Sequence, residues 1–128
     1  MKKEIFIIDD DPIYRLIVSK TINNIDSTLQ IVECENGEIG LAKLESINNL
    51  EHEIIVLLDI NMPVIDGWGV LKEIEKTNSP KQYLLSVYIV SSSTDESDIL
   101  KSKNFKFLKG FFSKPFKRED IKAIIGLE

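Results

Sequence analysis

Three consecutive carboxylates, Asp9, Asp10 and Asp11, stand between a short apolar run and Pro12. Adjacent ionised carboxylates repel one another, and the repulsion grows where neighbouring protein excludes water. Asp11 directly before Pro12 has the pairing expected of a helix N-cap followed by a proline at the first helical position. Asp9 and Asp10 have no such local role, so we expect a positive charge near them.

The elements that position these acids alternate along the chain. Five predicted strands occupy Glu4–Ile8, Leu29–Cys34, Ile54–Leu58, Val87–Val90 and a weaker segment around Gly110–Phe112. Helical patterns begin at Pro12, after Asn36-Gly37, after Asp66-Gly67, after Thr94-Asp95 and after Lys117-Arg118. The run Ile54–Leu58 has no polar alternation, which suits a parallel strand covered on both faces. Five strand–helix units in series predict a doubly wound α/β sheet.

Ligands of such sheets bind at the carboxyl ends of the strands, so the residues that follow each strand are the candidates. Asp59 follows the third strand, Ser91 the fourth and Lys114 the fifth. For each acid alone, a solvated loop is the simpler interpretation. As a set, Asp9, Asp10 and Asp59 supply hard oxygen donors, which suit Mg²⁺ or Mn²⁺ with retained waters better than zinc. We therefore predict a metal site beside a hydroxyl and an ammonium.

The composition restricts the class of protein. A net charge of -5 and a pI near 5.0 argue against general affinity for nucleic acid or for an anionic membrane. The longest apolar run, Ile54–Leu58, is too short to cross a bilayer. The single cysteine, Cys34, allows no internal disulfide and favours a reducing compartment. We expect a cytoplasmic protein with one domain over residues 1–128 and no output domain.

Four segments carry a family resemblance. The segments "IFIIDDDP", "IIVLLDINMPVIDGWGVL", "VYIVSSS" and "GFFSKPF" resemble, in order and spacing, the receiver domain of two-component response regulators. The resemblance covers essentially the whole chain. It implies a flavodoxin-like fold, with five helices around five parallel strands in the order 2-1-3-4-5. It also implies that Asp59 accepts a phosphoryl group from a sensor histidine kinase or a histidine phosphotransfer protein.

The resemblance assigns roles to the other residues of the set. It implies that Asp9 and Asp10 hold Mg²⁺ together with Asp59, and that Asn61 contributes its backbone carbonyl. Ser91 and Lys114 would contact the phosphoryl oxygens. For the Lys114-Pro115 peptide bond, base rates predict trans, whereas the resemblance favours cis. No organic cofactor is implied.

The residue types agree with phosphoryl transfer. A carboxylate can attack phosphorus to form an acyl phosphate, and positive charge around the transferring oxygens accounts for most of the catalysis. The chain would then catalyse only its own phosphorylation and dephosphorylation. Ser91 can bond to a phosphoryl oxygen only when one is present, and Phe111, where the family often has Tyr, would complete a switch. The signal would reach an unidentified downstream protein, or the phosphoryl group would be relayed.

Three other functions are compatible with parts of the pattern. A haloacid-dehalogenase-like phosphatase also uses an Asp nucleophile with Mg²⁺, but its second acid falls at Asn61, which cannot donate a proton in the same way. A flavin-binding protein would need a phosphate-binding loop where Asp9, Asp10 and Asp11 would repel phosphate. A receiver-like scaffold that is never phosphorylated would not need Asp59 and Lys114 together.

Overall fold

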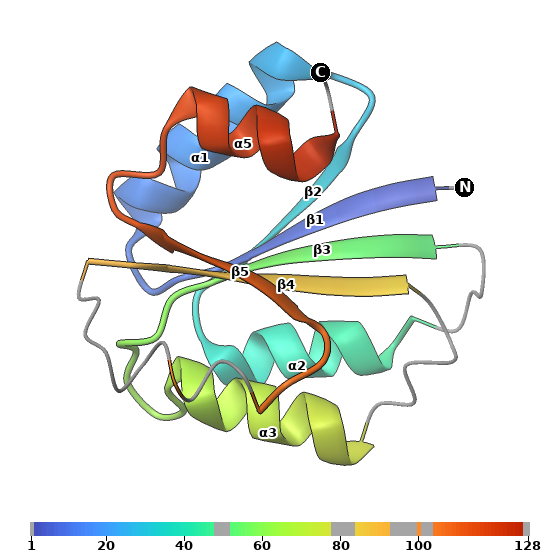
Figure 1. Ribbon diagram of the computed structural model, residues 1–128, viewed down its shortest axis with the longest axis vertical. Coiled ribbons are helices and arrows are strands. Elements are labelled where there is room, and N and C mark those ends of the chain that lie inside the picture. The colour runs from blue at the N-terminus through green and yellow to red at the C-terminus, as the bar shows by residue number, and fades with distance from the viewer. Residues whose placement is uncertain (1, 48–51, 78–83, 93–99, 101–103, 127–128) are drawn as a thin grey trace.

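The computed structural model describes residues 2–47, 52–77, 84–92, 100 and 104–126, and shows a parallel sheet between two layers of helices (Figure 1). In chain order the elements are β1 (Lys2–Ile8), α1 (Pro12–Ile25), β2 (Gln30–Cys34), α2 (Gly37–Glu45), β3 (His52–Leu58), α3 (Gly67–Thr77), β4 (Leu84–Ser91), β5 (Leu108–Ser113) and α5 (Arg118–Ile125).

The five strands form one parallel sheet in the order β2-β1-β3-β4-β5. This confirms the predicted doubly wound fold and its strand order. Four helices lie within the described residues, and the predicted helix after Thr94-Asp95 falls outside them. Four strands extend beyond their predicted bounds: β1 begins at Lys2, β3 begins at His52, β4 spans Leu84–Ser91 and β5 spans Leu108–Ser113. The strand β2 begins one residue later than predicted, at Gln30.

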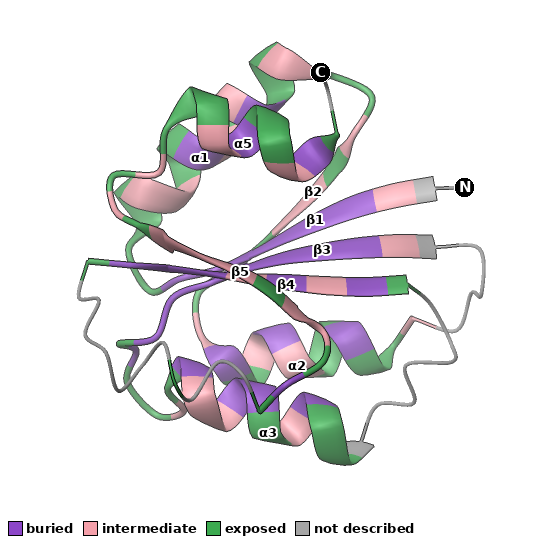
Figure 2. Ribbon diagram, in the orientation of Figure 1, coloured by how far each residue is buried: buried purple, intermediate pink, exposed green. Residues whose placement is uncertain are grey.

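The sheet separates two apolar layers. Alternate residues of β1 point to opposite faces, so Phe6 and Ile8 pack with residues of α2 and α3, whereas Ile5 and Ile7 pack with residues of α1 and α5. Figure 2 shows buried residues along the central strands and on the inner sides of the helices. Ile54–Leu58 of β3 is buried throughout, which confirms a strand covered on both faces.

The turn between β1 and α1 is fixed by a helix cap. Asp11 Oδ1 accepts hydrogen bonds from the backbone N–H groups of Ile13 at 3.0 Å and Tyr14 at 3.2 Å, and Pro12 is the first residue of α1. This arrangement satisfies two N–H groups that the helix itself leaves unpaired. The cap predicted from the Asp11-Pro12 pair is confirmed, and Asp9 and Asp10 remain at the carboxyl end of β1.

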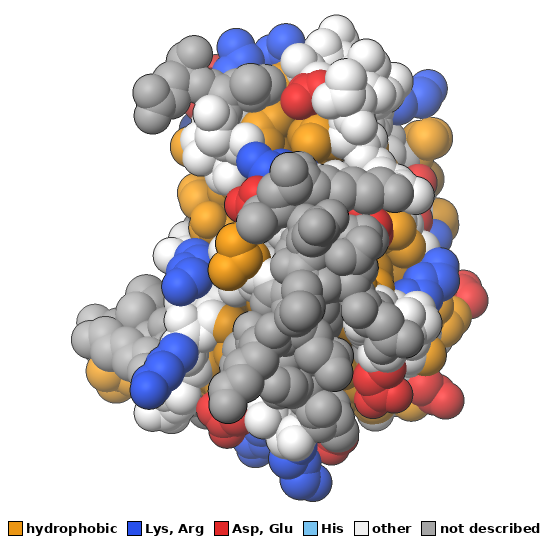
Figure 3. All heavy atoms as spheres, turned by 90° about the vertical axis from the view of Figure 1, so that its right-hand side faces the viewer, with side chains coloured by type: hydrophobic (Ala, Val, Ile, Leu, Met, Phe, Trp, Pro, Cys, Tyr) orange, Lys and Arg blue, Asp and Glu red, His pale blue; other side chains and the backbone are white. Residues whose placement is uncertain are grey.

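The opposite edge of the sheet, where the strands begin, carries mixed charge. In its described part, basic and acidic side chains are interspersed with apolar ones (Figure 3). Lys3 of β1 lies 3.8 Å from a carboxylate oxygen of Glu53 in β3, and its ammonium donates to the carbonyl of Ile125. Among the described residues, no helix combines the length and apolar character that crossing a bilayer requires.

Candidate functional site

Backbone hydrogen bonds continue past the strand ends and align the residues that follow them. The N–H of Asp59 donates to the carbonyl of Ile8 at 3.0 Å, so the ends of β3 and β1 stay side by side. The N–H of Lys114 donates to the carbonyl of Ser91 at 2.9 Å, which holds the segment after β5 against the end of β4. These bonds bring side chains from distant parts of the sequence to one edge of the sheet.

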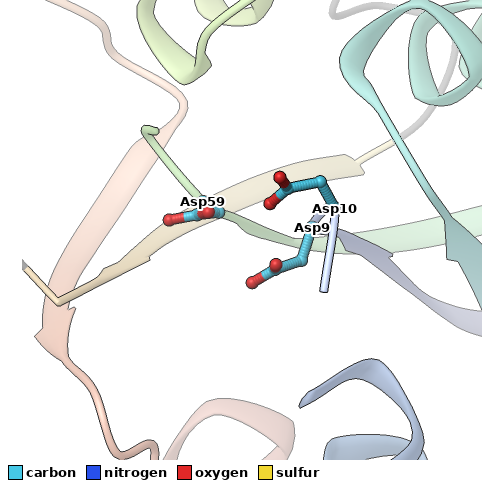
Figure 4. Close-up of side chains that lie close together, drawn as sticks. All are labelled: Asp9, Asp10 and Asp59. Carbon is cyan, nitrogen blue, oxygen red and sulfur yellow. The ribbon is translucent and has the colours of Figure 1, made fainter. Parts of the chain in front are cut away.

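Three carboxylates gather at this edge. Asp9, Asp10 and Asp59 each offer an oxygen within 4.8 Å of the others, and all three side chains project to the same side of the strand ends (Figure 4). Asp9 and Asp59 are buried, whereas Asp10 is exposed. An all-oxygen donor set with one solvent-facing member fits a hard divalent cation that keeps several waters. Asp11 takes no part, because its carboxylate caps α1.

Lys114 supplies a positive charge next to these acids. Its ammonium lies 2.8 Å from Asp9 Oδ2 and 3.8 Å from Asp59 Oδ1. The other oxygen of Asp9 accepts a hydrogen bond from the N–H of Asp11 at 2.9 Å. The Lys114-Pro115 peptide bond is cis. Lys114 therefore reduces the mutual repulsion of two buried carboxylates that face the same space.

The carboxyl group of Asp59 holds its proton unusually well. Burial raises the pKa of its carboxyl group from 3.8 to about 6, and the negative charge of Asp9 adds to the rise, while Lys114 opposes it. A desolvated carboxylate beside another anion is unfavourable unless a cation comes close. The site therefore favours either a proton on Asp59 or a further positive charge near it.

The raised pKa of Asp59 predicts a pH-dependent stability. The folded protein binds the proton of Asp59 more tightly than the unfolded chain does. The contribution of this proton to the stability of the folded state is therefore full below about pH 4 and is lost as pH rises through about 6. Without divalent metal, Asp59→Asn should therefore be more stable than wild type at pH 7.5, by on the order of 2 kcal/mol. Urea unfolding at pH 4 and pH 7.5 measures the free energy of unfolding of both proteins. If Asp59→Asn differed from wild type by the same amount at both pH values, the prediction would be wrong.

Three other predicted residues lie around this edge in different environments. Ser91 is fully buried as the last residue of β4, whereas Ser92 after it is exposed. Phe111 is half-buried in β5, opposite Ile89 of β4, and packs against the core layer of α2 and α3. Asn61 is exposed in the loop between β3 and α3. The expectation that the fourth strand ends at Val90 was wrong by one residue, because Ser91 still pairs with Ser113.

The loop that follows Asp59 packs tightly against the start of α3. The N–H of Gly67 donates to the carbonyl of Ile60 at 2.8 Å. A Cβ atom at residue 67 would lie 2.7 Å from the carbonyl oxygen of Asp59 and 2.8 Å from Cα of Ile60. Only a residue without a side chain allows this approach of two backbone segments. Gly67 thereby allows the start of α3 to pack against the backbone of Asp59 and Ile60.

Two residues near the acids were not predicted to belong to the site. The ring of Tyr14 lies beneath the ammonium of Lys114, with 4.2 Å between Nζ and the ring centroid. Arg15 donates from Nη1 to the backbone carbonyl of Asp9 and pairs through Nε with Glu33 at 3.3 Å. In the sequence, Tyr14 belongs to an apolar helical stripe. The one feature of the sequence that could have placed Tyr14 near the site is its position in the first helical turn after Asp11.

Comparison with known protein families identifies the class of the chain. The model of the response regulator receiver domain matches residues 5–126. The chain therefore belongs to the receiver domain family of two-component response regulators. Receiver domains are signalling domains that bind Mg²⁺ at an acidic pocket and interact with histidine kinases and downstream effectors. The acid cluster described above could hold such an ion.

The curated relatives are longer proteins. The chain is 27% identical over 124 residues to a probable transcriptional regulator ycf27 of Cyanophora paradoxa, a match that covers 97% of this chain and 47% of the relative. It is 37% identical over 92 residues to a protein-glutamate methylesterase/protein-glutamine glutaminase of Carboxydothermus hydrogenoformans, covering 71% of this chain and 24% of that protein. The chain thus spans half or less of these two proteins.

Solved structures share the fold at low sequence identity. A two-component response regulator from Legionella pneumophila superposes with a TM-score of 0.82 at 22% identity, covering 98% of this chain and 97% of that one. The chemotaxis protein CheY4 of Vibrio cholerae superposes with a TM-score of 0.79 at 19% identity, covering 98% of both chains. At these identities the comparison establishes the fold.

Proposed function

We propose that this chain accepts a phosphoryl group on Asp59 from a phosphohistidine, supplied by a sensor histidine kinase or a histidine phosphotransfer protein. The observation that carries the proposal is the placement of the Lys114 ammonium against both Asp9 and Asp59 within the acid cluster. A lysine beside a buried carboxylate pair is suited to receive a group whose three oxygens share a charge of about -1.5 to -2. Family membership makes this the expected reaction.

In the proposed transfer, an oxygen of Asp59 forms a bond to phosphorus as the bond from phosphorus to the donor nitrogen breaks. The nitrogen keeps the electron pair of the broken bond. Lys114 moves from Asp9 toward a phosphoryl oxygen, because the transferred group brings more charge than the carboxylate has lost. Asp9, Asp10, Asp59 and the backbone carbonyl of Asn61 would hold Mg²⁺, which when bound neutralises charge on the phosphoryl oxygens.

A small phosphodonor tests the proposal without any partner protein. The purified chain is incubated with acetyl phosphate and Mg²⁺, and its intact mass is then measured. We expect the mass of one phosphoryl group to be added, and we expect no addition when EDTA replaces Mg²⁺. A chain that never gains the group, at any donor concentration or sampling time, would favour the alternative of a scaffold that is not phosphorylated.

Asp10 tests the metal ligands. Asp10→Asn should weaken Mg²⁺ binding by at least about tenfold, because even partners outside the direct ligands typically contribute that much. Asp11→Asn is the matched control, since it removes the same charge one residue away while an asparagine still caps α1. Isothermal titration calorimetry of both variants with Mg²⁺ measures the two affinities. Equal affinities would remove Asp10 from the metal site.

The proposed output is a switch that involves Ser91 and Phe111. Ser91 is fully buried at the end of β4, and Phe111 is half-buried on the neighbouring strand. When Asp59 carries the phosphoryl group, the Ser91 hydroxyl turns toward it and Phe111 fills the space that is left. In this second packing, the surface around β5 binds an unidentified downstream protein more tightly than the resting surface does. The signal passes on only if the partner has a higher affinity for one of the two packings.

Beryllofluoride, which imitates a phosphoryl group on a carboxylate, tests this switch. Amide chemical shifts should change at Ser91, Ser92 and Lys109–Phe112, as well as beside Asp59. Phe111→Ala should keep the changes near Asp59 and reduce those in β5. Changes confined to the neighbours of Asp59 would reject the switch and favour a relay of the phosphoryl group.

A further inference from the structure

Among the described residues, three side chains interact with the ammonium of Lys114, and two of them are the expected acids. It donates a hydrogen bond to Asp9 at 2.8 Å and lies 3.8 Å from Asp59. The third neighbour is the face of the Tyr14 ring, 4.2 Å from Nζ to the centroid. That distance lies within the range in which a cation is attracted by the negative face of an aromatic ring.

Tyr14 is itself held in place. Its N–H is bonded to the Asp11 carboxylate at the start of α1, and its side chain packs against the core layer of α1 and α5. Burial raises the pKa of the Tyr14 hydroxyl, and the charges of Asp9 and Asp59 raise it further, so the side chain is neutral at physiological pH. The ring therefore gives Lys114 a fixed, uncharged support.

We propose that Tyr14 is a positioning residue for phosphoryl transfer, whose ring face holds the Lys114 ammonium beside Asp59. The inference rests on the proposed function. A ring face attracts a cation without fixing its direction, in contrast to a hydrogen-bond acceptor. Lys114 can therefore turn from Asp9 toward an incoming phosphoryl oxygen while it keeps its contact with the ring. The ring also excludes water from one side of the ammonium, which strengthens its attraction for the phosphoryl oxygens.

The kinetic test compares two replacements of Tyr14. Tyr14→Phe keeps the ring face and should phosphorylate with acetyl phosphate and Mg²⁺ within about twofold of the wild-type rate. Tyr14→Leu keeps an apolar side chain without a ring face and should be slower by about three- to thirtyfold, which corresponds to the usual strength of a cation–π contact. If Tyr14→Leu does not fold, Tyr14→Met takes its place. Equal rates for the ring-bearing and ringless variants would overturn the proposal.

A double-mutant cycle separates positioning from a general effect on the fold. In a Lys114→Met background no ammonium remains to be held, so Tyr14→Leu should no longer change the phosphorylation rate. If its effect is the same with and without Lys114, Tyr14 acts through the fold and the proposal fails.

A measurement on the unphosphorylated protein keeps this inference distinct from the proposed function. The ring current of Tyr14 should shift the Lys114 Cε protons upfield in wild type and in Tyr14→Phe, and Tyr14→Leu should abolish the shift. A wild-type protein that shows the shift but takes up no phosphoryl group would refute the proposed function alone. A protein that takes up the group without the shift would refute the positioning role alone.

Discussion

Asp59→Asn is expected to abolish the uptake of a phosphoryl group from acetyl phosphate. The amide that replaces the carboxylate has no anionic oxygen to attack phosphorus, and the substitution removes one of the three clustered carboxylates proposed to hold the metal. Asp9 is less available as an acceptor, because in the resting structure one of its oxygens accepts a hydrogen bond from Lys114 and the other from the N–H of Asp11. The intact mass after incubation with the donor and Mg²⁺ measures the effect.

Asp11→Asn is the control for this experiment, since it removes an acid from the same turn and keeps the cap of α1. It should gain the phosphoryl mass as the wild type does. If Asp59→Asn still gained that mass, peptide mapping would have to locate a different acceptor, and the assignment of Asp59 would be wrong.

Lys114→Met should slow phosphorylation by about a hundredfold or more, because in the proposed reaction it removes the positive charge that stabilises the oxygens of the transferring group. The methionine keeps an unbranched apolar stem of similar length and changes mainly the charge. The rate with acetyl phosphate at saturating Mg²⁺ measures the loss. Lys109→Met, at an exposed lysine of β5, the strand that precedes Lys114, should leave the rate near that of wild type.

Lys114→Met should also change the affinity for Mg²⁺, and in the opposite direction to the phosphorylation rate. The Lys114 ammonium lies against two of the proposed metal ligands, so its removal leaves the acid cluster more negative. Mg²⁺ should therefore bind more tightly to Lys114→Met while phosphorylation becomes slower. A variant that loses metal affinity and rate together would indicate a damaged fold, and the assigned role of Lys114 would then lack support.

Much of the fold could be predicted because the sequence pattern is set by local physics. Unbroken apolar runs such as Ile54–Leu58 are characteristic of strands buried on both faces, and Asp11-Pro12 indicates the start of a helix. Parallel strands place their carboxyl ends at one edge, so the convergence of Asp9, Asp59 and Lys114 followed from the order of the elements alone.

The rest of the site depends on side-chain geometry that no local pattern encodes. Tyr14 has the spacing of an ordinary core residue, and its place beneath Lys114 depends on how α1 crosses the end of the sheet. The inclusion of Ser91 in β4 depends on its pairing with Ser113, a residue more than twenty positions away. The peptide bond before Pro115 could be assigned only through the family resemblance.

The contact between Lys114 and Asp9 joins residues 105 positions apart in the sequence, and this separation has a consequence for how the protein folds. Such long-range contacts close large loops, whose entropy must be lost before any attraction is gained. The acids on β1 and β3 belong to the centre of the sheet, whereas Lys114 arrives only with the edge strand β5. If the central strands pair before β5 is added, their carboxylates come together without the charge of the lysine to offset their repulsion. A contact that forms late in folding slows unfolding more than it speeds folding, and we expect the contact between Lys114 and Asp9 to be of this kind.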